Sequence, residues 1–391
     1  MKLKNRNILI ISPFFSPELI STGKFNTDMA LALRDEGHHV TILCSHPLYP
    51  KWKTEKSDEQ IPGIRIIRGG LRVRYPKRTI LRRAILELWF ASFVFKNIFK
   101  YQKKQDIIVP VFPPSLAFYV ILSLLNKKII KVGIVHDLQE IYSSKKKGAL
   151  NKIISLFINK IEKGNFNGCD KIIFLSSEMK DTAKEIYALA QSKLEVQYPF
   201  VTKKIQGSTN ALANILINDE INIVYSGALG EKQNPEGLYS FFDFASKSLK
   251  NTRFHFFSQG HIFEELKERN LNSSIKFHDL VEKENLGELY ERSTIQVVPQ
   301  LPGTSKGSLP SKLPNLLASD CQILVITDKD SEIENIFKTN NFQTVITSWK
   351  NEILLKAVEE ILNEKTQNNS ERIKKSEDIF NIDSLIKKIV F

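Results

Sequence analysis

Short apolar runs alternate with helix-like stretches along both halves of this 391-residue chain. In the first half the apolar runs are residues 7–11, 40–44, 106–111, 129–135 and 171–175, with helical patterns at 25–36 and 150–163. In the second half they are residues 221–225, 253–257, 275–277, 295–298 and 322–327, with helical patterns near 237–248, 263–270 and 286–292 and another from Ser311. Short buried strands between helices are typical of parallel sheets built from βαβ units. The pattern therefore predicts an α/β protein with two such sheets.

Two series of this kind predict two Rossmann-like domains, with ligand bound in a cleft that faces the carboxyl ends of the strands. The polar segment 199–219 separates the two series, and we place the interdomain linker there. We expect an N-terminal domain at residues 1–200 and a C-terminal domain at residues 220–371. The charged, helical residues 372–391 are expected to pack back onto the N-terminal domain.

The charge balance is strongly basic, with 56 Lys and Arg against 43 Asp and Glu and a formal net charge of +13. Such an excess favours an anionic partner, which is a nucleic acid, a membrane surface or a phosphorylated substrate. No RNA-binding or helix-turn-helix signature is present, and two Rossmann-type sheets fit nucleic-acid binding poorly, so we expect no nucleic-acid partner.

The cysteines and the apolar runs bear on the compartment. Cys44, Cys169 and Cys321 are far apart in sequence, so neither a disulfide framework nor a zinc site is indicated, and a reducing, cytoplasmic setting is expected. Residues 8–11 are too short for a secretory apolar region. No apolar run reaches the roughly 18 uncharged residues that predict a membrane-spanning helix.

A basic, apolar segment at residues 71–104 carries ten Lys and Arg and one acid, Glu87. Its apolar positions predict a helix with a wide apolar face, an interfacial tryptophan and flanking cations. This combination is typical of helices that lie in a membrane surface. The membrane-binding residues that we expect are Arg82, Arg83, Trp89, Phe93, Lys96 and Lys100. A core helix with a solvated basic edge is the alternative interpretation.

The segment 303–320 begins as a loop of small residues and becomes apolar and helix-like. Ser308 or Ser311 is a candidate helix cap, and Pro310 suits the first turn. A loop that enters a helix N-terminus offers unpaired N–H groups to a phosphate, and Lys306 and Lys312 add positive charge beside it. The segment predicts a site for a diphosphate leaving group, although an ordinary strand–loop–helix turn with surface lysines has the same pattern.

Three further segments carry candidate chemistry. The first loop ends in Ser21-Thr22-Gly23 just before a helix, but it lacks the glycine spacing of a Walker A or GxGxxG loop. His136-Asp137 follows a strand, where His136 would donate to a sugar hydroxyl and Asp137 would orient or deprotonate an acceptor hydroxyl. Gly227 and Lys232 follow another strand, which suits a cation for a diphosphate. Each of the three also fits an ordinary loop.

These four segments, in this order, resemble the family 4 retaining glycosyltransferases of the GT-B fold. The resemblance is strongest to the branch that handles bacterial exopolysaccharide and O-antigen, including colanic-acid-type transferases. The matching elements are residues 17–30 and 37–52, the HDL element at 136–138, the phosphate-lysine element at 226–233, and the LPSK signature at 309–312 with Asn315. The chain has Gly307 and Asn315 where many members have two donor-site glutamates, and Ala228 where many have a phosphate-binding arginine.

The resemblance implies a GT-B fold with two Rossmann-like domains whose parallel sheets face each other across a cleft. The N-terminal domain would bind the acceptor and face the membrane, and the C-terminal domain would bind a nucleotide-sugar. His136, Asp137 and Lys232 would be catalytic. The implied donor-binding residues are Thr22, Gly23, Gly227, Lys232, Ser308, Leu309, Pro310, Ser311, Lys312 and Asn315.

The implied reaction is a metal-independent hexosyl transfer that retains the anomeric configuration. The donor is a nucleotide-sugar, with a UDP-sugar favoured, and no cofactor is expected besides this substrate. The acceptor is a polyprenyl-diphosphate-linked saccharide of O-antigen, capsule or exopolysaccharide synthesis. The enzyme would be cytoplasmic and peripheral on the anionic inner face of the cytoplasmic membrane. A nucleotide-sugar 2-epimerase and a non-catalytic glycan- or lipid-binding scaffold are the alternatives.

Overall fold

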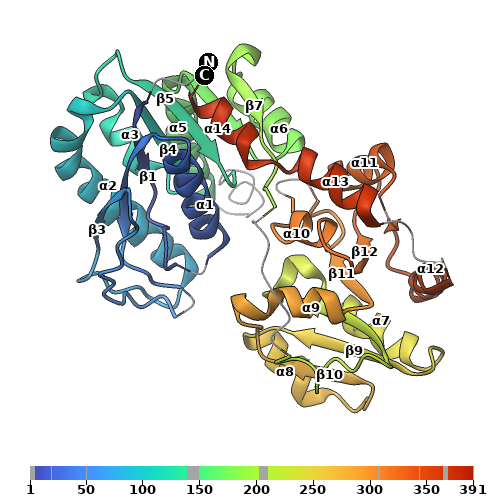
Figure 1. The fold of residues 1–391 in the computed structure, drawn as a ribbon. Coiled ribbons are helices and arrows are strands. Elements are labelled where there is room, and N and C mark those ends of the chain that lie inside the picture. Colours follow the sequence, from blue (N-terminus) through green and yellow to red (C-terminus); the bar gives the residue numbers. More distant parts are fainter. Residues whose placement is uncertain are drawn as a thin grey trace. The chain divides into compact units, whose positions relative to one another are not determined.

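The computed structural model describes residues 5–18, 20–49, 51–138, 149–201, 210–305, 309–342, 344–363 and 369–390 (Figure 1). The chain divides into two compact units. The first comprises residues 1–199 and 381–391, and the second comprises residues 200–380. The chain thus enters the second unit at Phe200 and returns to the first at Asn381, where the sequence suggested boundaries at 200 and 372.

The first unit contains a sheet of seven strands within the part of the chain that the structure describes, in the order β3-β2-β1-β4-β5-β6-β7. All neighbouring strands pair in parallel. The strands are β1 (Asn7–Ile11), β2 (His39–Ser45), β3 (Ile64–Gly69), β4 (Ile107–Phe112), β5 (Ile130–Val135), β6 (Lys171–Phe174) and β7 (Leu194–Val196). Because the order reverses between β1 and β4, the connections on either side of this point cross opposite faces of the sheet.

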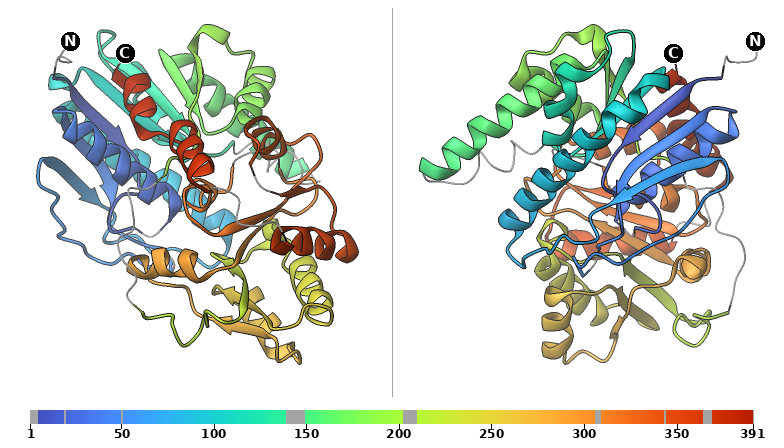
Figure 2. Two further views of the ribbon diagram at one scale, coloured as in Figure 1. Left: turned by 45° about the vertical axis from the view of Figure 1, so that its right-hand side comes forward. Right: turned by 90° about the vertical axis from the view of Figure 1, so that its left-hand side faces the viewer.

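Two groups of helices cover this sheet. The helices are α1 (Ser21–Asp35), α2 (Thr79–Tyr101), α3 (Leu116–Ile121), α5 (Ala149–Gly168), α6 (Ser177–Tyr187) and α14 (Ile382–Val390). Helix α1 packs beside α14, and α3 packs between α2 and α5. Figure 2 shows α2 and α5 on one side of the sheet and α14 on the other. Residues of α2, α3, α5 and α6 share one apolar core with the strands.

The second unit repeats this plan with a six-stranded parallel sheet among its described residues, in the order β10-β9-β8-β11-β12-β13. The strands are β8 (Ile221–Ser226), β9 (Thr252–Phe257), β10 (Ile275–His278), β11 (Ile295–Pro299), β12 (Gln322–Ile326) and β13 (Val345–Ile346). The helices are α7 (Pro235–Ser246), α8 (His261–Arg269), α9 (Leu286–Arg292), α10 (Leu313–Leu317), α11 (Glu332–Asn340), α12 (Asn351–Asn363) and α13 (Asn369–Ile379). The order reverses between β8 and β11.

The predicted α/β class with two parallel, Rossmann-like sheets is confirmed. The apolar runs named from the sequence became strands, whereas β3, β7 and β13 were missed. Strand β3 mixes isoleucine with arginine just before the basic segment, so its pattern resembled that of a charged surface. Strands β7 and β13 have only three and two residues, too few for a periodic signal. No helix among the described residues is long and apolar enough to cross a membrane.

Candidate functional site

The carboxyl ends of β8 and β11 meet where the strand order of the second sheet reverses. In open α/β sheets, this is the place where ligands bind. Four sequence-predicted residues lie in the loops and the short helix around this point: Gly227, Lys232, Lys312 and Asn315. The geometry of the two lysines differs strongly.

Lys312 brings a buried ammonium to the ends of these two strands. Its Nζ donates to the carbonyl oxygen of Ser226 at 2.9 Å and to that of Val297 at 3.2 Å, so it links β8 to β11. The same nitrogen lies 4.4 Å from the centre of the Tyr225 ring. Burial lowers the pKa of Lys312 from 10.5 to about 7. A cation held in this way is poised to gain or lose its proton near neutral pH and responds strongly to a nearby anion.

Lys232 approaches the same region through its main chain. It lies in an exposed single turn, Glu231–Gln233, and its carbonyl oxygen accepts a hydrogen bond from the Leu301 amide at 2.8 Å. Leu301 follows β11, so the loops after β8 and β11 are tied together. The side chain of Lys232 is exposed.

Gly227 and Gly303 present bare backbone at this edge. Gly227 has φ +124° and Gly303 has φ +78°, which are conformations that side chains other than glycine rarely adopt. A Cβ built on either glycine would have no atom of the described residues within 4 Å. The backbone of both loops therefore faces open space, which lets a ligand approach it closely.

The LPSK segment differs from its predicted form. Helix α10 has five residues, begins at Leu313 and has Lys312 as its N-cap without a side-chain cap bond. The prediction that Ser311 caps a helix here is wrong, because Ser311 is exposed in the preceding turn, where the Leu313 amide bonds to the Pro310 carbonyl. Leu309 is buried and Asn315 is half-buried. Ser308, with Lys306 and Gly307, lies outside the described residues.

Arg372, which the sequence did not single out, fixes the far end of α10. Its guanidinium donates to the carbonyl oxygens of Leu317, Ser319 and Cys321. Arginine is suited to this work because its planar fork carries five donors and retains its charge when buried. The only sequence signal was an arginine in a charged helical stretch, which is indistinguishable from a surface position.

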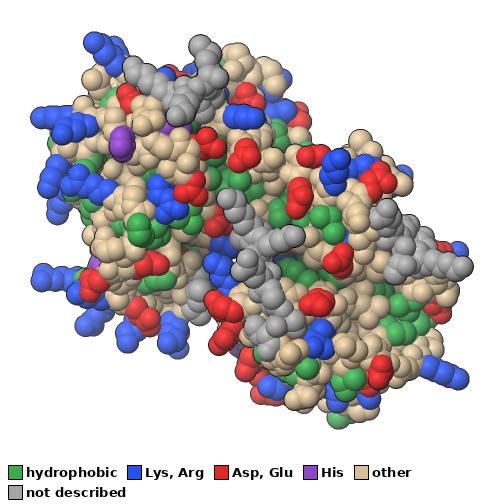
Figure 3. Space-filling view, in the orientation of Figure 1, with side chains coloured by type: hydrophobic (Ala, Val, Ile, Leu, Met, Phe, Trp, Pro, Cys, Tyr) green, Lys and Arg blue, Asp and Glu red, His purple; other side chains and the backbone are tan. Residues whose placement is uncertain are grey.

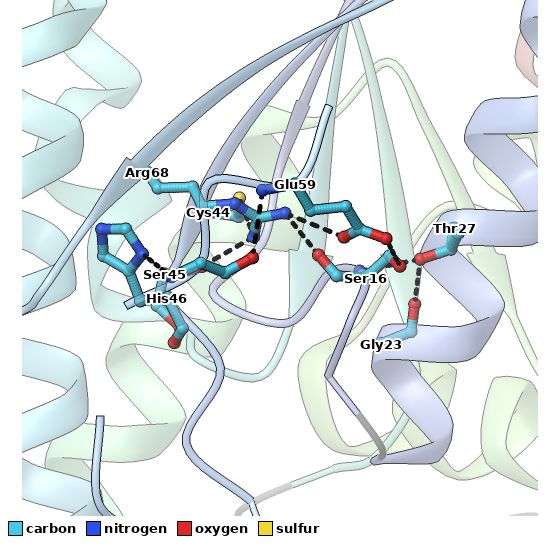
Figure 4. A network of polar contacts seen from close by, with 9 residues as sticks. Ser16, Gly23, Thr27, Cys44, Ser45, His46, Glu59 and Arg68 are labelled. Carbon is cyan, nitrogen blue, oxygen red and sulfur yellow. Dashed lines mark hydrogen bonds and ion pairs between the residues drawn. The ribbon is translucent and has the colours of Figure 1, made fainter. Parts of the chain in front are cut away.

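The first sheet reverses its order between β1 and β4, and the loop after β1 is held firmly there. Arg68 on β3 donates to the carbonyl oxygens of Ser45 and Ser16 and pairs with Glu59 at 3.4 Å (Figure 4). The Ser16 hydroxyl donates to Glu59 at 3.0 Å, and its amide donates to Thr27 at 2.9 Å. This network anchors the loop that leads into α1, whose first turn contains the predicted residues Thr22 and Gly23.

The start of α1 continues that network. The Thr27 hydroxyl donates to the Gly23 carbonyl oxygen at 2.8 Å. Gly23 is buried, and a Cβ there would lie 3.1 Å from Glu18, so the close approach of the loop favours glycine. Thr22 is half-buried in the first turn of the helix. The carboxylate of Glu18 accepts from the amides of Leu48 and Tyr49, which attaches the loop to the segment after β2.

His136 follows β5 and faces α1. Its ring meets Phe25 edge-on, with the centroids 4.7 Å apart, so the structure brings the HDL element and the first loop together. Its Nε2 is buried and has no hydrogen-bond partner among the residues that the structure describes. Burial lowers the pKa of His136 to about 3, which keeps the imidazole neutral at physiological pH. Asp137 follows it and is half-buried.

Asn26 is a second polar side chain at this edge that the sequence analysis missed. It is fully buried, and its Nδ2 donates to the Ser12 hydroxyl and to the Phe14 carbonyl oxygen, both at 2.9 Å. Its Oδ1 has no hydrogen-bond partner in the described part of the chain. Buried polar atoms are nearly always paired, so unpaired atoms on Asn26 and His136 mark this edge as a place for a polar ligand.

The predicted membrane-binding residues fall on two sides of α2. Arg83, Lys96 and Lys100 are exposed. Trp89 is half-buried: it packs against Gly70 and the apolar core, and its Nε1 donates to the Tyr75 hydroxyl. Its interfacial role stays a prediction. Phe93 likewise packs against Gly69.

The Arg82 side chain also contacts a neighbouring residue. The exposed apolar side chains of α2 are not the ones that the sequence suggested. The Arg82 guanidinium lies over the Trp52 ring at 4.0 Å. The exposed apolar side chains of α2 are Ile80, Leu81, Leu88, Phe95 and Phe99. Figure 3 shows Lys and Arg side chains gathered along the outer edge of the first unit, where α2 lies in Figure 1. The described residues hold no group of three or more His, Cys, Asp or Glu side chains able to bind a metal.

Known proteins share both the sequence features and the fold. Residues 22–203 match Glycosyltransferase Family 4. The putative colanic acid biosynthesis glycosyl transferase WcaI of Escherichia coli (strain K12) is 23% identical over 358 residues, which cover 85% of this chain and 86% of that protein.

Solved structures resemble the chain over its whole length. Sucrose-phosphate synthase from Thermosynechococcus elongatus superposes with a TM-score of 0.75 at 16% identity and covers 98% of this chain and 97% of its own. WaaG, a glycosyltransferase involved in lipopolysaccharide biosynthesis, gives a TM-score of 0.70 at 13% identity, covering 98% and 99%. The chain is therefore a glycosyltransferase with the GT-B fold, and its residues 22–203 match the model of Glycosyltransferase Family 4.

Proposed function

We propose that this glycosyltransferase moves a hexosyl group from a nucleotide-sugar, most simply a UDP-sugar, to a lipid-linked saccharide in the synthesis of a bacterial surface polysaccharide. The names of two similar proteins support this setting, since WcaI is assigned to colanic acid and WaaG to lipopolysaccharide. The observation that carries the proposal is the buried ammonium of Lys312 at the carboxyl ends of β8 and β11.

The second unit is proposed to hold the donor. The diphosphate would lie against the bare backbone at Gly227, within reach of the Lys312 ammonium and of the flexible Lys232 side chain. Departure of the nucleoside diphosphate develops negative charge on the phosphate oxygen. Fixed cations and amides at that point stabilise the transition state more than the ground state. In this proposal the two lysines stabilise the negative charge of the leaving group, and no metal is required for that task.

The transfer itself is proposed to retain the anomeric configuration. The bond between the anomeric carbon and the phosphate oxygen breaks, and the acceptor hydroxyl oxygen forms its bond to that carbon from the same face. The acceptor proton passes to the departing phosphate oxygen, so atoms and charge balance. Neutral His136 would hydrogen bond to a hydroxyl of the transferred sugar, and Asp137 would orient the acceptor. Retention would appear as an unchanged anomeric coupling in the NMR spectrum of the product.

The outer side of α2 is proposed to lie on the anionic inner face of the cytoplasmic membrane. The exposed side chains Leu88, Phe95 and Phe99 are interleaved with the cations Arg83, Lys96 and Lys100. Helix α5, which packs against α3 next to α2, adds exposed Leu156 and Phe157. Apolar side chains beside cations are the composition that binds an anionic bilayer surface. Such placement would bring the active site to a lipid-linked acceptor.

The proposed function is tested by incubating the full chain with UDP-, GDP-, dTDP- and CMP-sugars, first alone and then with a lipid-linked saccharide. A thermal shift with one nucleotide-sugar and product only with acceptor would support transfer. Conversion of the sugar without acceptor would instead identify a 2-epimerase. Transfer should proceed in EDTA, and Lys232→Ala should lower turnover by about tenfold, because it removes one cation from the leaving group.

A non-catalytic scaffold is the second candidate, favoured by Asn315 and Ala228 standing where relatives carry charged residues. Asn315 is a hydrogen-bonding group without charge, so it can bind a ribose but adds nothing to charge stabilisation. Binding of a nucleotide-sugar without turnover on any lipid-linked acceptor would support the scaffold and reject the transferase.

A further inference from the structure

A group of aromatic rings with one arginine lies next to the loop after β1, and neither the donor site nor the membrane face includes it. We name Tyr49, Trp52, Tyr75 and Arg82 the aromatic–arginine cluster. The Tyr49 and Trp52 centroids are 6.1 Å apart and the Trp52 and Tyr75 centroids are 6.2 Å apart, both edge-on. All four side chains are partly exposed. The rings therefore form a stiff platform that still reaches solvent.

The Arg82 guanidinium lies over this platform, and no described residue uses its donors. Its Cζ is 4.0 Å from the centre of the Trp52 ring. No side chain or carbonyl among the described residues hydrogen bonds to its guanidinium or forms an ion pair with it. A stacked guanidinium keeps its N–H groups in the plane of the fork, pointing away from the ring, which is the geometry that grips a phosphate with two bonds. The stack fixes the donors before any ligand arrives.

Trp52 is held in an unusual conformation to make this stack. Its φ is +52°, in the left-handed region that bulky residues rarely adopt. Such a backbone persists only where the surroundings impose it, and it is concentrated at binding sites. Tyr75 helps to impose it: Tyr75 contacts Trp52 and accepts a hydrogen bond from Trp89 of α2.

The surroundings of the cluster carry uncompensated positive charge. Lys53 and Arg74 oppose each other in an isolated antiparallel bridge, an arrangement that like charges disfavour in the absence of an anion. Residues 60–86 contain eight Lys and Arg and no Asp or Glu. Three of the nearby acids pair with other cations, which are Glu55 with Lys51, Asp58 with Lys56, and Glu59 with Arg68, while Glu18 accepts from the Tyr49 amide.

The cluster also joins the proposed acceptor side of the first unit. Phe14 and Ile20, from the loop after β1, pack in one apolar group with Trp52, Tyr75 and Trp89. The amide of Tyr49 donates to the carboxylate of Glu18 at 3.2 Å, and Glu18 contacts Gly23. The same loop therefore connects the cluster to the carboxyl end of β1.

We propose that the aromatic–arginine cluster, with Lys53 and Arg74, is a second anion site, and that it binds the diphosphate of the lipid-linked acceptor. The assignment rests on the proposed function for the identity of the acceptor. The donor diphosphate would bind to the second unit, so the two phosphate sites are in different units of the chain. The sequence suggested Arg82 as a membrane-binding residue. In this proposal it binds the acceptor diphosphate instead of the bilayer.

The test measures binding of geranyl diphosphate to the full chain by calorimetry, with the donor site saturated by UDP. Wild-type protein should bind the probe, and Arg82→Met should weaken binding by about tenfold, because it keeps the stem and removes the bidentate donors. Arg82→Lys should be nearly as weak, since an ammonium retains the charge without the planar stack. The double variant Lys53→Met with Arg74→Met alters only exposed side chains and should weaken probe binding by a similar factor. If the Arg82 variants fail to fold, this double variant still tests the site.

Lys128→Met, which removes an exposed cation elsewhere in the first unit, should leave binding unchanged. Absence of geranyl diphosphate binding to the wild type, or equal binding by the Arg82→Met and wild-type proteins, would overturn the site. Equal affinity for inorganic pyrophosphate would assign the site to a free anion and reject the lipid-linked ligand. If Arg82→Met instead impairs association with phosphatidylglycerol vesicles alone, the cluster belongs to the membrane surface. Failure of the proposed function would show separately, as loss of UDP binding or of transfer in the wild type.

Discussion

The two sheets reverse their strand order in the same way, but their carboxyl ends carry different polar groups. In the first unit, this edge has buried neutral groups with unpaired atoms, the Oδ1 of Asn26 and the Nε2 of His136. In the second unit, the corresponding edge has a buried ammonium, Lys312, bonded to two strand carbonyls. Neutral donors and acceptors suit hydroxyl groups, whereas a cation suits a phosphate. One fold has thus been equipped for two kinds of ligand.

The largest expected effect comes from removing the cation that distinguishes the second edge. Lys312→Met should lower kcat/KM for the nucleotide-sugar by about a hundredfold, the size typical of losing one fixed electrostatic donor in a site. It should also cost roughly 1–3 kcal/mol of stability, because the carbonyls of Ser226 and Val297 lose their partner. Initial rates and thermal melts measure the two effects. Lys250→Met, an exposed lysine of the same unit, is the control, and unchanged kcat/KM in Lys312→Met would remove the basis of the comparison.

A second prediction concerns the outer side of the first unit. Lys96→Ala with Lys100→Ala should reduce binding to anionic vesicles by about thirtyfold, because each cation near such a surface contributes roughly 1 kcal/mol. Sedimentation with phosphatidylglycerol vesicles at two salt concentrations measures this. Equal binding of the double variant and the wild type would contradict a membrane role for α2.

A third prediction tests the neutral edge. His136→Phe keeps the ring against Phe25 and removes the buried Nε2, so kcat should fall by about tenfold while the melting temperature stays the same or rises. Loss of activity with gain of stability is the sign of a functional group that the fold does not need. His39→Phe, at an exposed histidine, should change neither quantity. A lowered melting temperature with normal turnover would assign His136 a structural role.

The smallest expected effect is on pH dependence. Burial lowers the pKa of Lys312 from 10.5 to about 7, so between these pH values the unfolded chain holds more protons than the folded protein. The contribution of Lys312 to stability therefore rises with pH across that window. Its ammonium loses charge above about pH 7, and the KM for the nucleotide-sugar should rise several-fold between about pH 6.5 and 8.5. In Lys312→Met this rise should be absent, and its persistence there would assign the titration to another group.

The sequence was sufficient for the architecture because short apolar runs between helices leave few arrangements other than parallel sheets. It also placed His136 after a strand and Lys312 beside the start of a helix. It was not sufficient for the direction of side chains: Trp89 and Leu88 are adjacent and apolar, yet one packs on Gly70 and the other is exposed. Contacts between residues far apart in the chain, such as Arg372 with the end of α10, leave no local pattern to detect.

The discontinuity of the first unit affects how the protein is made. Helix α14 contributes residues 382–390 to a unit whose sheet is complete by Val196, and Lys388 donates to the Val196 carbonyl oxygen at 2.7 Å. A ribosome must synthesise all of residues 200–380 before α14 emerges. Until then, the surface of α1 that α14 later covers remains exposed. Native assembly of the earliest residues is thus governed by some of the last to be translated.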